Sequence, residues 1–147
     1  GEEGGEARCY HSGVYHDPPP GERHEWVHEK PKIKPPSLRI YEAHVGMSSE
    51  EQRCGTYREF ADEVLPKVHE LGYNCVQLMA VADHAYYACF GYQVTNFFAA
   101  AHRSGGPEDL KYLVDKCHGL GLKTIIAEKQ RWEPAHTSSL NGFQATE

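Results

Sequence analysis

The sequence has no excess of basic residues and no long apolar segment. It contains 15 Lys and Arg against 21 Asp and Glu, so its formal net charge is −6, whereas nucleic acids and anionic membranes attract basic surfaces. No apolar run approaches the roughly 20 residues that a membrane-spanning helix needs. We therefore expect neither a nucleic acid nor a membrane as a partner, while a neutral polymer is compatible with this charge.

Cysteine pairs and metal-binding motifs are also missing. The five cysteines are odd in number and form no CxxC pair, which favours reduced thiols inside the cell over a disulfide framework. None of the ten histidines lies in an HExxH motif or beside paired cysteines. His24 and His28 are four residues apart, but they lie in a proline-flanked segment where a helix is not expected. The sequence therefore predicts no metal site.

The N-terminus has neither a starting methionine nor the features of a signal peptide. Residues 1–6 are acidic and include no apolar stretch. We expect an intracellular protein with further sequence upstream of Gly1. Residues 1–37 hold most of the prolines and predict an extended connector, with one short strand near His24–Val27.

The first regular elements after the connector are a strand and a helix. Leu38–Val45 predicts a strand in which Glu42 and His44 share one face, since side chains alternate across a strand. Thr56 and Glu59 form a capping box that begins a helix, and Gly72 ends it. Pro66 is expected to kink this helix or limit its regular part. The apolar stripe of the helix comprises Tyr57, Phe60, Ala61, Val64, Leu65, Val68 and Leu71.

A second strand leads into a segment rich in aromatic residues. Asn74–Val81 is mostly apolar, which predicts a strand buried on both faces and covered by helices. Asp83–Phe98 then contains six Tyr and Phe residues around Gly91, too many for an ordinary solvated loop. Aromatic rings with polar tips suit a carbohydrate-binding platform, and they equally suit a loop that packs on its own small core.

The last predicted elements complete an alternating pattern. Pro107 begins a helix, with acidic residues in its first turn, and Gly119 and Gly121 end it. Its buried face comprises Leu110, Leu113, Val114 and Cys117. Leu122–Ile126 predicts a third strand, so the order strand, helix, strand, helix, strand indicates an α/β fold with parallel strands and right-handed crossovers.

Four segments resemble the 1,4-α-glucan branching enzymes of the α-amylase superfamily, most closely the eukaryotic starch- and glycogen-branching enzymes. These are RIYEAHVGMSS at residues 39–49, LGYNCVQLMA at 71–80, HAYYACFGYQVTNFFA at 84–99 and GGPEDLKYLVDKCHGLGL at 105–122. The similarity covers roughly residues 15–122. Strings of this length are far more specific than a short motif.

The resemblance implies a partial (β/α)8 TIM barrel. A complete barrel needs about 250 residues, so 147 residues would supply its first three strands and two helices, with the rest of the barrel missing. Residues 1–37 would be a connector with the tail of a preceding carbohydrate-binding module. Residues 38–147 would be the N-terminal fragment of the glycosidase-type catalytic domain.

The resemblance also implies positions for a sugar-binding site. Gly91-Tyr92 matches a Gly-Tyr pair whose tyrosine stacks on the sugar at the cleavage point. Asp83 and His84 stand where these enzymes carry Glu-His, although bracing of the loop is an equally good role for them. The family's D-V-V-H-S-H motif is altered, because Ala127 replaces its aspartate and Gln130 its histidine. Similarity resumes at L-N-G-F, residues 140–143, so residues 127–139 form a local replacement.

The family reaction cleaves an α-1,4 link in a glucan and transfers the segment to a 6-hydroxyl, without a metal or redox cofactor. The partner would be amylose, amylopectin or glycogen, and the compartment the plastid or the cytosol. The catalytic carboxylates come from later strands, so we expect this chain alone to be inactive. A truncated paralogue that binds glucan or a protein partner without catalysis is the alternative, and a related amylase-type hydrolase fits less well.

Overall fold

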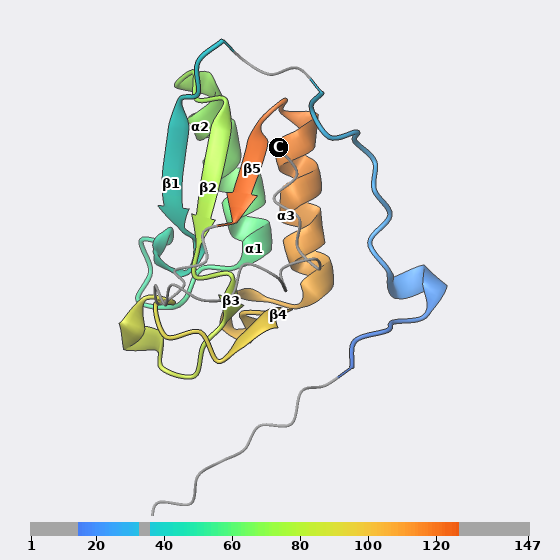
Figure 1. The fold of residues 1–147 in the computed structure, drawn as a ribbon, viewed down its shortest axis with the longest axis vertical. Coiled ribbons are helices and arrows are strands. Elements are labelled where there is room, and N and C mark those ends of the chain that lie inside the picture. The colour runs from blue at the N-terminus through green and yellow to red at the C-terminus, as the bar shows by residue number, and fades with distance from the viewer. Residues whose placement is uncertain (1–14, 33–35, 127–147) are drawn as a thin grey trace, which may run out of the picture.

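The computed structural model describes residues 15–32 and 36–126, and its centre is a three-stranded parallel sheet. The strands are β1 (Ile40–His44), β2 (Cys75–Met79) and β5 (Lys123–Ile126), in the order β1-β2-β5 (Figure 1). Glu42 of β1 pairs with Gln77 of β2, which pairs with Ile125 of β5. The predicted α/β class with parallel strands is confirmed.

The helix between β1 and β2 is one continuous helical segment with a widened turn in its middle. It comprises α1 (Tyr57–Glu59), the π-helical turn η3 (Phe60–Val64) and α2 (Leu65–Glu70). The predicted capping box of Thr56 and Glu59 is present. Pro66 lies in the first turn of α2, directly after the π-helical turn, where its missing N–H interrupts the regular helical hydrogen bonds. The prediction that Pro66 limits the regular helix is confirmed.

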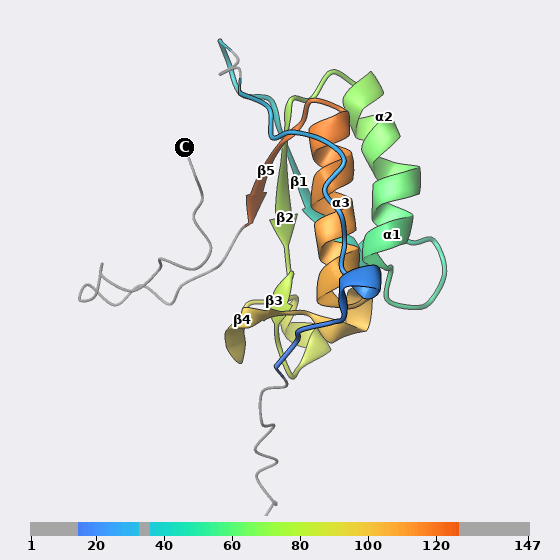
Figure 2. The ribbon, with the colours of Figure 1, turned by 90° about the vertical axis from the view of Figure 1, so that its right-hand side faces the viewer.

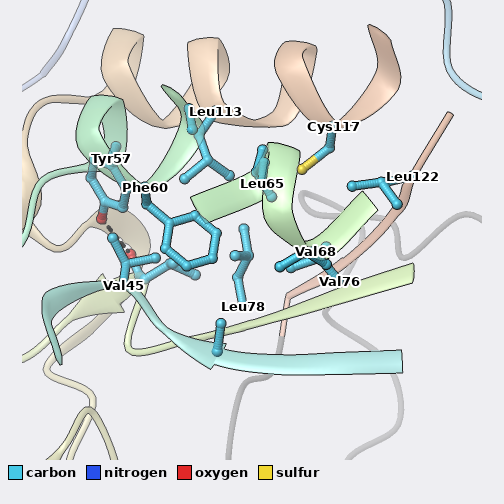
Figure 3. Close-up of a cluster of buried hydrophobic side chains, with 13 residues drawn as sticks. Val45, Tyr57, Phe60, Leu65, Val68, Val76, Leu78, Leu113, Cys117 and Leu122 are labelled. Carbon is cyan, nitrogen blue, oxygen red and sulfur yellow. Dashed lines mark hydrogen bonds between the residues drawn. The ribbon is translucent and has the colours of Figure 1, made fainter. Parts of the chain in front are cut away.

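The helices all lie against one face of the sheet, where they enclose the core (Figure 2). The second crossover ends in α3 (Pro107–Gly119), whose Leu113 and Cys117 are buried as predicted. Figure 3 shows these side chains meeting Phe60 and Leu65 of the first helical segment above Val76 and Leu78 of β2. Burial of these apolar surfaces is the main source of the fold's stability.

Two details of burial differ from the sequence prediction. Leu71 was expected in the apolar stripe but is 74% exposed, because α2 ends at Glu70 and Gly72 turns the chain with a φ of +83°. On β2, Val76 faces the helices, whereas Gln77 and Met79 on the opposite face are partly exposed. The helices of the described residues cover one face, so β2 is not fully buried on both.

The short strand expected at His24–Val27 is not formed. The connector instead has a 3-10 turn, η1 (Pro20–Glu22), followed by an extended run beside α3. The backbone N–H groups of Val27 and His28 donate to the carboxylate of Asp115 rather than to a neighbouring strand. This side chain on α3 therefore takes the place of a strand partner.

The aromatic segment is more regular than the sequence indicates. Two strands, β3 (Ala82–Asp83) and β4 (Asn96–Ala100), pair antiparallel with an irregular register. Between them lies the 3-10 turn η4 (Tyr87–Cys89). Two further 3-10 turns, η2 (Val45–Met47) and η5 (His102–Ser104), follow β1 and β4. No helix in the described ranges is long and apolar enough to cross a membrane.

Candidate functional site

The residues from β3 to β4, here called the aromatic hairpin (residues 82–100), project from the edge of the sheet where β1 and β2 end (Figure 1). In parallel α/β sheets, ligands bind at this carboxyl-terminal edge. Several of the hairpin's rings are exposed, and they include Tyr86, Phe90, Tyr92, Phe97 and Phe98. The candidate site therefore lies on the aromatic hairpin and on the strand ends beneath it.

Gly91 allows the hairpin to fold back onto the end of β2. Its φ is +79°, and a Cβ atom added there would lie 2.5 Å from the Cα of Ala80. Phe90 before it also has a positive φ of 53°. Both the left-handed conformation and the close approach require glycine at residue 91. The next residue, Tyr92, is 49% exposed.

His84 is a buried residue of the hairpin. Its exposure is 3%, and its Nδ1 lies 3.0 Å from the carbonyl oxygen of Ala82. Because a carbonyl only accepts, Nδ1 donates in this contact. Within the described ranges Nε2 has no hydrogen-bond partner. His84 therefore has one unpaired ring nitrogen near the candidate site but almost no surface that a ligand could cover.

Asp83 makes the contacts of a residue that braces the hairpin. Its Oδ1 lies 2.9 Å from Nδ1 of His102, and its carbonyl oxygen accepts from the backbone N–H and the hydroxyl of Thr95. These bonds join the end of β3 to the residue before β4 and to the turn that follows the hairpin. They favour the loop-bracing role that the sequence left open.

His44, at the end of β1, lies against the underside of the hairpin. Its ring meets the edges of Tyr87 and Phe90, with centroids 6.3 and 6.1 Å away. Burial lowers the pKa of His44, and the neighbouring His84 adds to that effect. Glu42, predicted on the same face, accepts from Nε2 of Gln77 at 3.1 Å. This contact is structural, and His44 is a neutral ring packed among aromatics.

Sequence reasoning gave no special role to Tyr87, which joins the hairpin to the loop after β1. Its hydroxyl donates to the carbonyl of Gly46 at 3.2 Å, and a Cβ at Gly46 would meet that hydroxyl at 3.0 Å. Burial raises the pKa of Tyr87, with a further contribution from Cys54. Arg103 lies 5.7 Å from the ring centroid and donates to the carbonyl of Ala85. The sequence gives one indication of this contact. Gly46 directly follows the predicted first strand, and a glycine there is typical of a site where another part of the chain approaches the backbone closely.

Two predicted positions cannot be placed, because Ala127 and Gln130 lie outside the described residues. In residues 15–32 and 36–126, no three His, Cys, Asp or Glu side chains form a group that could hold a metal ion.

Of the predicted site residues, Asp83, His84 and Tyr92 all lie in the aromatic hairpin.

The chain is similar in sequence to known 1,4-alpha-glucan-branching enzymes. It is 54% identical over 134 residues, 90% of its length, to the 1,4-alpha-glucan-branching enzyme of Solanum tuberosum. It is 60% identical over 134 residues to the chloroplastic/amyloplastic 1,4-alpha-glucan-branching enzyme of Oryza sativa subsp. japonica. It is also 56% identical over 116 residues to the enzyme of that name from Emericella nidulans. The chain spans 15 to 17% of the length of these relatives.

No family model matches the chain. Among solved structures, a candidate alpha amylase from Salmonella typhimurium is similar, with a TM-score of 0.55 and 31% identity. That match covers 60% of this chain and 15% of the Salmonella chain. The resemblance seen in the sequence is confirmed: over 90% of its length, the chain is homologous to a part of the 1,4-alpha-glucan-branching enzymes.

Proposed function

We propose that this chain is part of a 1,4-alpha-glucan-branching enzyme and contributes the first section of its catalytic barrel. The observation that carries the proposal is the identity of 54 to 60% over 134 residues with relatives of that name. The reaction would cleave an α-1,4 link in amylose, amylopectin or glycogen and form an α-1,6 branch. Its compartment would be the plastid or the cytosol, and it would need no metal or redox cofactor.

The sheet supports the assignment of residues 38–147 to a (β/α)8 barrel, preceded by a connector in residues 1–37. Its strands are parallel, neighbouring strands are joined through helical segments, and these helices lie on the outer face. On the other face, Glu42 is exposed, and Gln77 and Met79 are partly exposed. In a closed barrel this face would be the filled interior.

The aromatic hairpin would supply part of the glucan-binding rim. Tyr92 is its proposed stacking residue, because an exposed ring beside a fixed glycine turn presents a flat apolar face to a sugar. We propose Asp83 and His84 as supports of this surface in addition to their proposed part in binding. Asp83 would fix the strands of the hairpin, and Nε2 of His84 could accept from a group outside the described residues.

The chain alone would lack the reaction's catalytic groups. A retaining glycosidase mechanism needs a nucleophilic carboxylate and a carboxylic acid about 5 to 5.5 Å apart, and in the family both come from later strands. Ala127 and Gln130, in place of an aspartate and a histidine, favour the second candidate function. That candidate is a truncated paralogue that binds glucan or a protein partner without catalysis.

A chimera of the Solanum tuberosum enzyme tests the proposal. Its matching segment is replaced by residues 15–126 of this chain, and α-1,6 branch points formed on amylose are measured by NMR. We expect this chimera to be active, whereas a second chimera that also carries residues 127–139 loses activity. A folded but inactive first chimera would contradict the proposal.

The isolated chain provides the complementary prediction. Purified without other branching enzymes, it should form no α-1,6 links on amylose, because the catalytic carboxylates are on later strands. New branch points from the pure protein, measured by the same NMR method, would show that the chain supplies its own catalytic groups. That result would contradict both hypotheses, that the chain is an inactive fragment and that it is a truncated paralogue without catalysis.

A further inference from the structure

Residues 16–28, here called the strap, follow α3 over most of its length (Figures 1 and 2). Contacts along the strap keep the order of the helix. His16 meets Glu108 in the first turn of α3, and His28 meets Asp115 one turn before the helix ends. The strap and α3 therefore run in the same direction, and the extended connector predicted from the proline-rich composition packs along a helix.

Asp115 is the centre of this contact. It is 4% exposed, and its carboxylate accepts from the backbone N–H groups of Val27 and His28 at 3.1 and 2.9 Å. Ring nitrogens of His24 and His28 lie 3.2 and 3.3 Å away. A buried carboxylate without partners is costly, and all of these partners come from the strap. Asp115 and the strap therefore depend on each other.

Further contacts fix the strap on both sides of Asp115. Toward its N-terminal end, the carboxylate of Glu108 accepts from the backbone N–H of His24 and lies 3.1 Å from the ring of His16. Toward its C-terminal end, Trp26 stacks on His118 with ring centroids 5.9 Å apart. A Cβ at Gly119 would lie 2.8 Å from the His28 ring, so the strap also packs closely on the end of α3.

We propose that residues 16–28 form a fixed strap rather than a flexible connector, and that Asp115 is the positioning residue that fastens it to α3. At the other end of the strap, His16 lies against Glu108 in the first turn of α3, which begins shortly after the aromatic hairpin. The inference rests on contacts within the chain and does not depend on the proposed function. The proposal assigns the buried carboxylate of Asp115 a structural role, separate from any catalytic step.

Hydrogen exchange of the 147-residue chain, measured by NMR, tests the strap. The amides of Val27 and His28 should be protected, and Asp115→Ala should speed their exchange about tenfold or more, since hydrogen bonds to a charged group are lost. Exchange in β2 should stay unchanged. Asp62→Ala is the matched control, because Asp62 bonds to Tyr112 and Lys116 of α3 without touching the strap.

Two results would overturn the proposal. One is unprotected amides at Val27 and His28 in the unaltered chain. The other is an Asp115→Ala variant that speeds exchange equally in the strap and in β2, which would make Asp115 a general stability residue.

A second pair of variants leaves Asp115 intact and covers the case in which Asp115→Ala does not fold. Val27→Pro removes one N–H donor from the strap, whereas Val27→Ala keeps it, and the Val27 side chain is itself 76% exposed. Trypsin should cleave after Arg23 and Lys32 faster in the proline variant than in the alanine variant. Equal cleavage rates in the two variants would also overturn the proposal.

Discussion

The proposed role of Tyr92 in glucan binding can be tested by a single substitution. An exposed aromatic stack contributes on the order of 1 kcal/mol, so Tyr92→Ala should weaken the binding of maltooligosaccharides about fivefold. Tyr92 is 49% exposed, and removal of its side chain should leave the fold intact. Titration calorimetry on protein with an unchanged circular dichroism spectrum gives the affinity.

Tyr112 on α3 is the control for this experiment. Its ring lies 4.4 Å from the guanidinium of Arg58, and its hydroxyl donates to Asp62 at 2.8 Å. Tyr112→Ala should therefore affect stability more than sugar binding. Equal affinity of the unaltered chain and Tyr92→Ala would leave the hairpin with a packing role.

Single residues show where sequence reasoning reaches its limit. The sequence selects His84 through its neighbours in a long motif, yet it does not reveal that the ring is buried with one nitrogen tied to Ala82. It predicts the apolar face of α3 but not the burial of Asp115 between Leu113 and Cys117. Both facts depend on segments distant in the chain, which local periodicity does not report.

Among the structural elements, the aromatic hairpin depends on the backbone conformation of Gly91. Gly91→Ala should lower the free energy of unfolding by about 1 to 3 kcal/mol, because residue 91 has a positive φ, and the clash with Ala80 adds to that cost. Gly72 separates the two effects, since it also has a positive φ but no atom within 4 Å of an added Cβ. Urea unfolding followed by circular dichroism should show a larger loss for Gly91→Ala than for Gly72→Ala. Equal losses would mean that the approach to Ala80 is not tight in solution.

Helix boundaries were predictable because their causes are local. Thr56 and Glu59 cap α1 through bonds across one turn, and Gly72 ends the helix through its own backbone conformation. The strand Asn96–Ala100 was missed, since its partner is a strand of two residues, Ala82–Asp83. Pairing of this kind arises from the turn and the packing of the whole hairpin.

For the whole molecule, the alternation of strands and helices in the sequence predicted that the strands are parallel. It did not predict which faces of the sheet the helices cover. Sequence predicted that helices cover both faces of β2, whereas Gln77 and Met79 are partly exposed. An apolar strand interior fits burial by helices and burial inside a barrel equally well. Within the described residues, helices cover one face of β2, and Gln77 and Met79 on the other face stay partly exposed.

Attachment of the strap should depend on pH, because two carboxylates, those of Glu108 and Asp115, hold it on α3. Lys111, the N–H of His24 and the ring of His16 lower the pKa of Glu108 to about 2. Burial acts to raise the pKa of Asp115, but the N–H groups of Val27 and His28 and the His28 ring outweigh it, so its pKa is also lowered. A carboxylate with a lowered pKa stabilises the folded state above its unfolded pKa, about 4, and this contribution is lost as the pH falls.

The strap should therefore detach between about pH 4 and pH 2, and Trp26 reports it because its ring stacks on His118. With Trp132 replaced by Phe, Trp26 is the sole tryptophan, and its fluorescence emission should shift to the red as the strap leaves α3. Glu108→Gln keeps His118 but removes one titrating carboxylate, so its shift over the same range should be smaller. Circular dichroism of the same samples separates release of the strap from unfolding of the sheet. An identical shift in both proteins would show that Glu108 does not hold the strap.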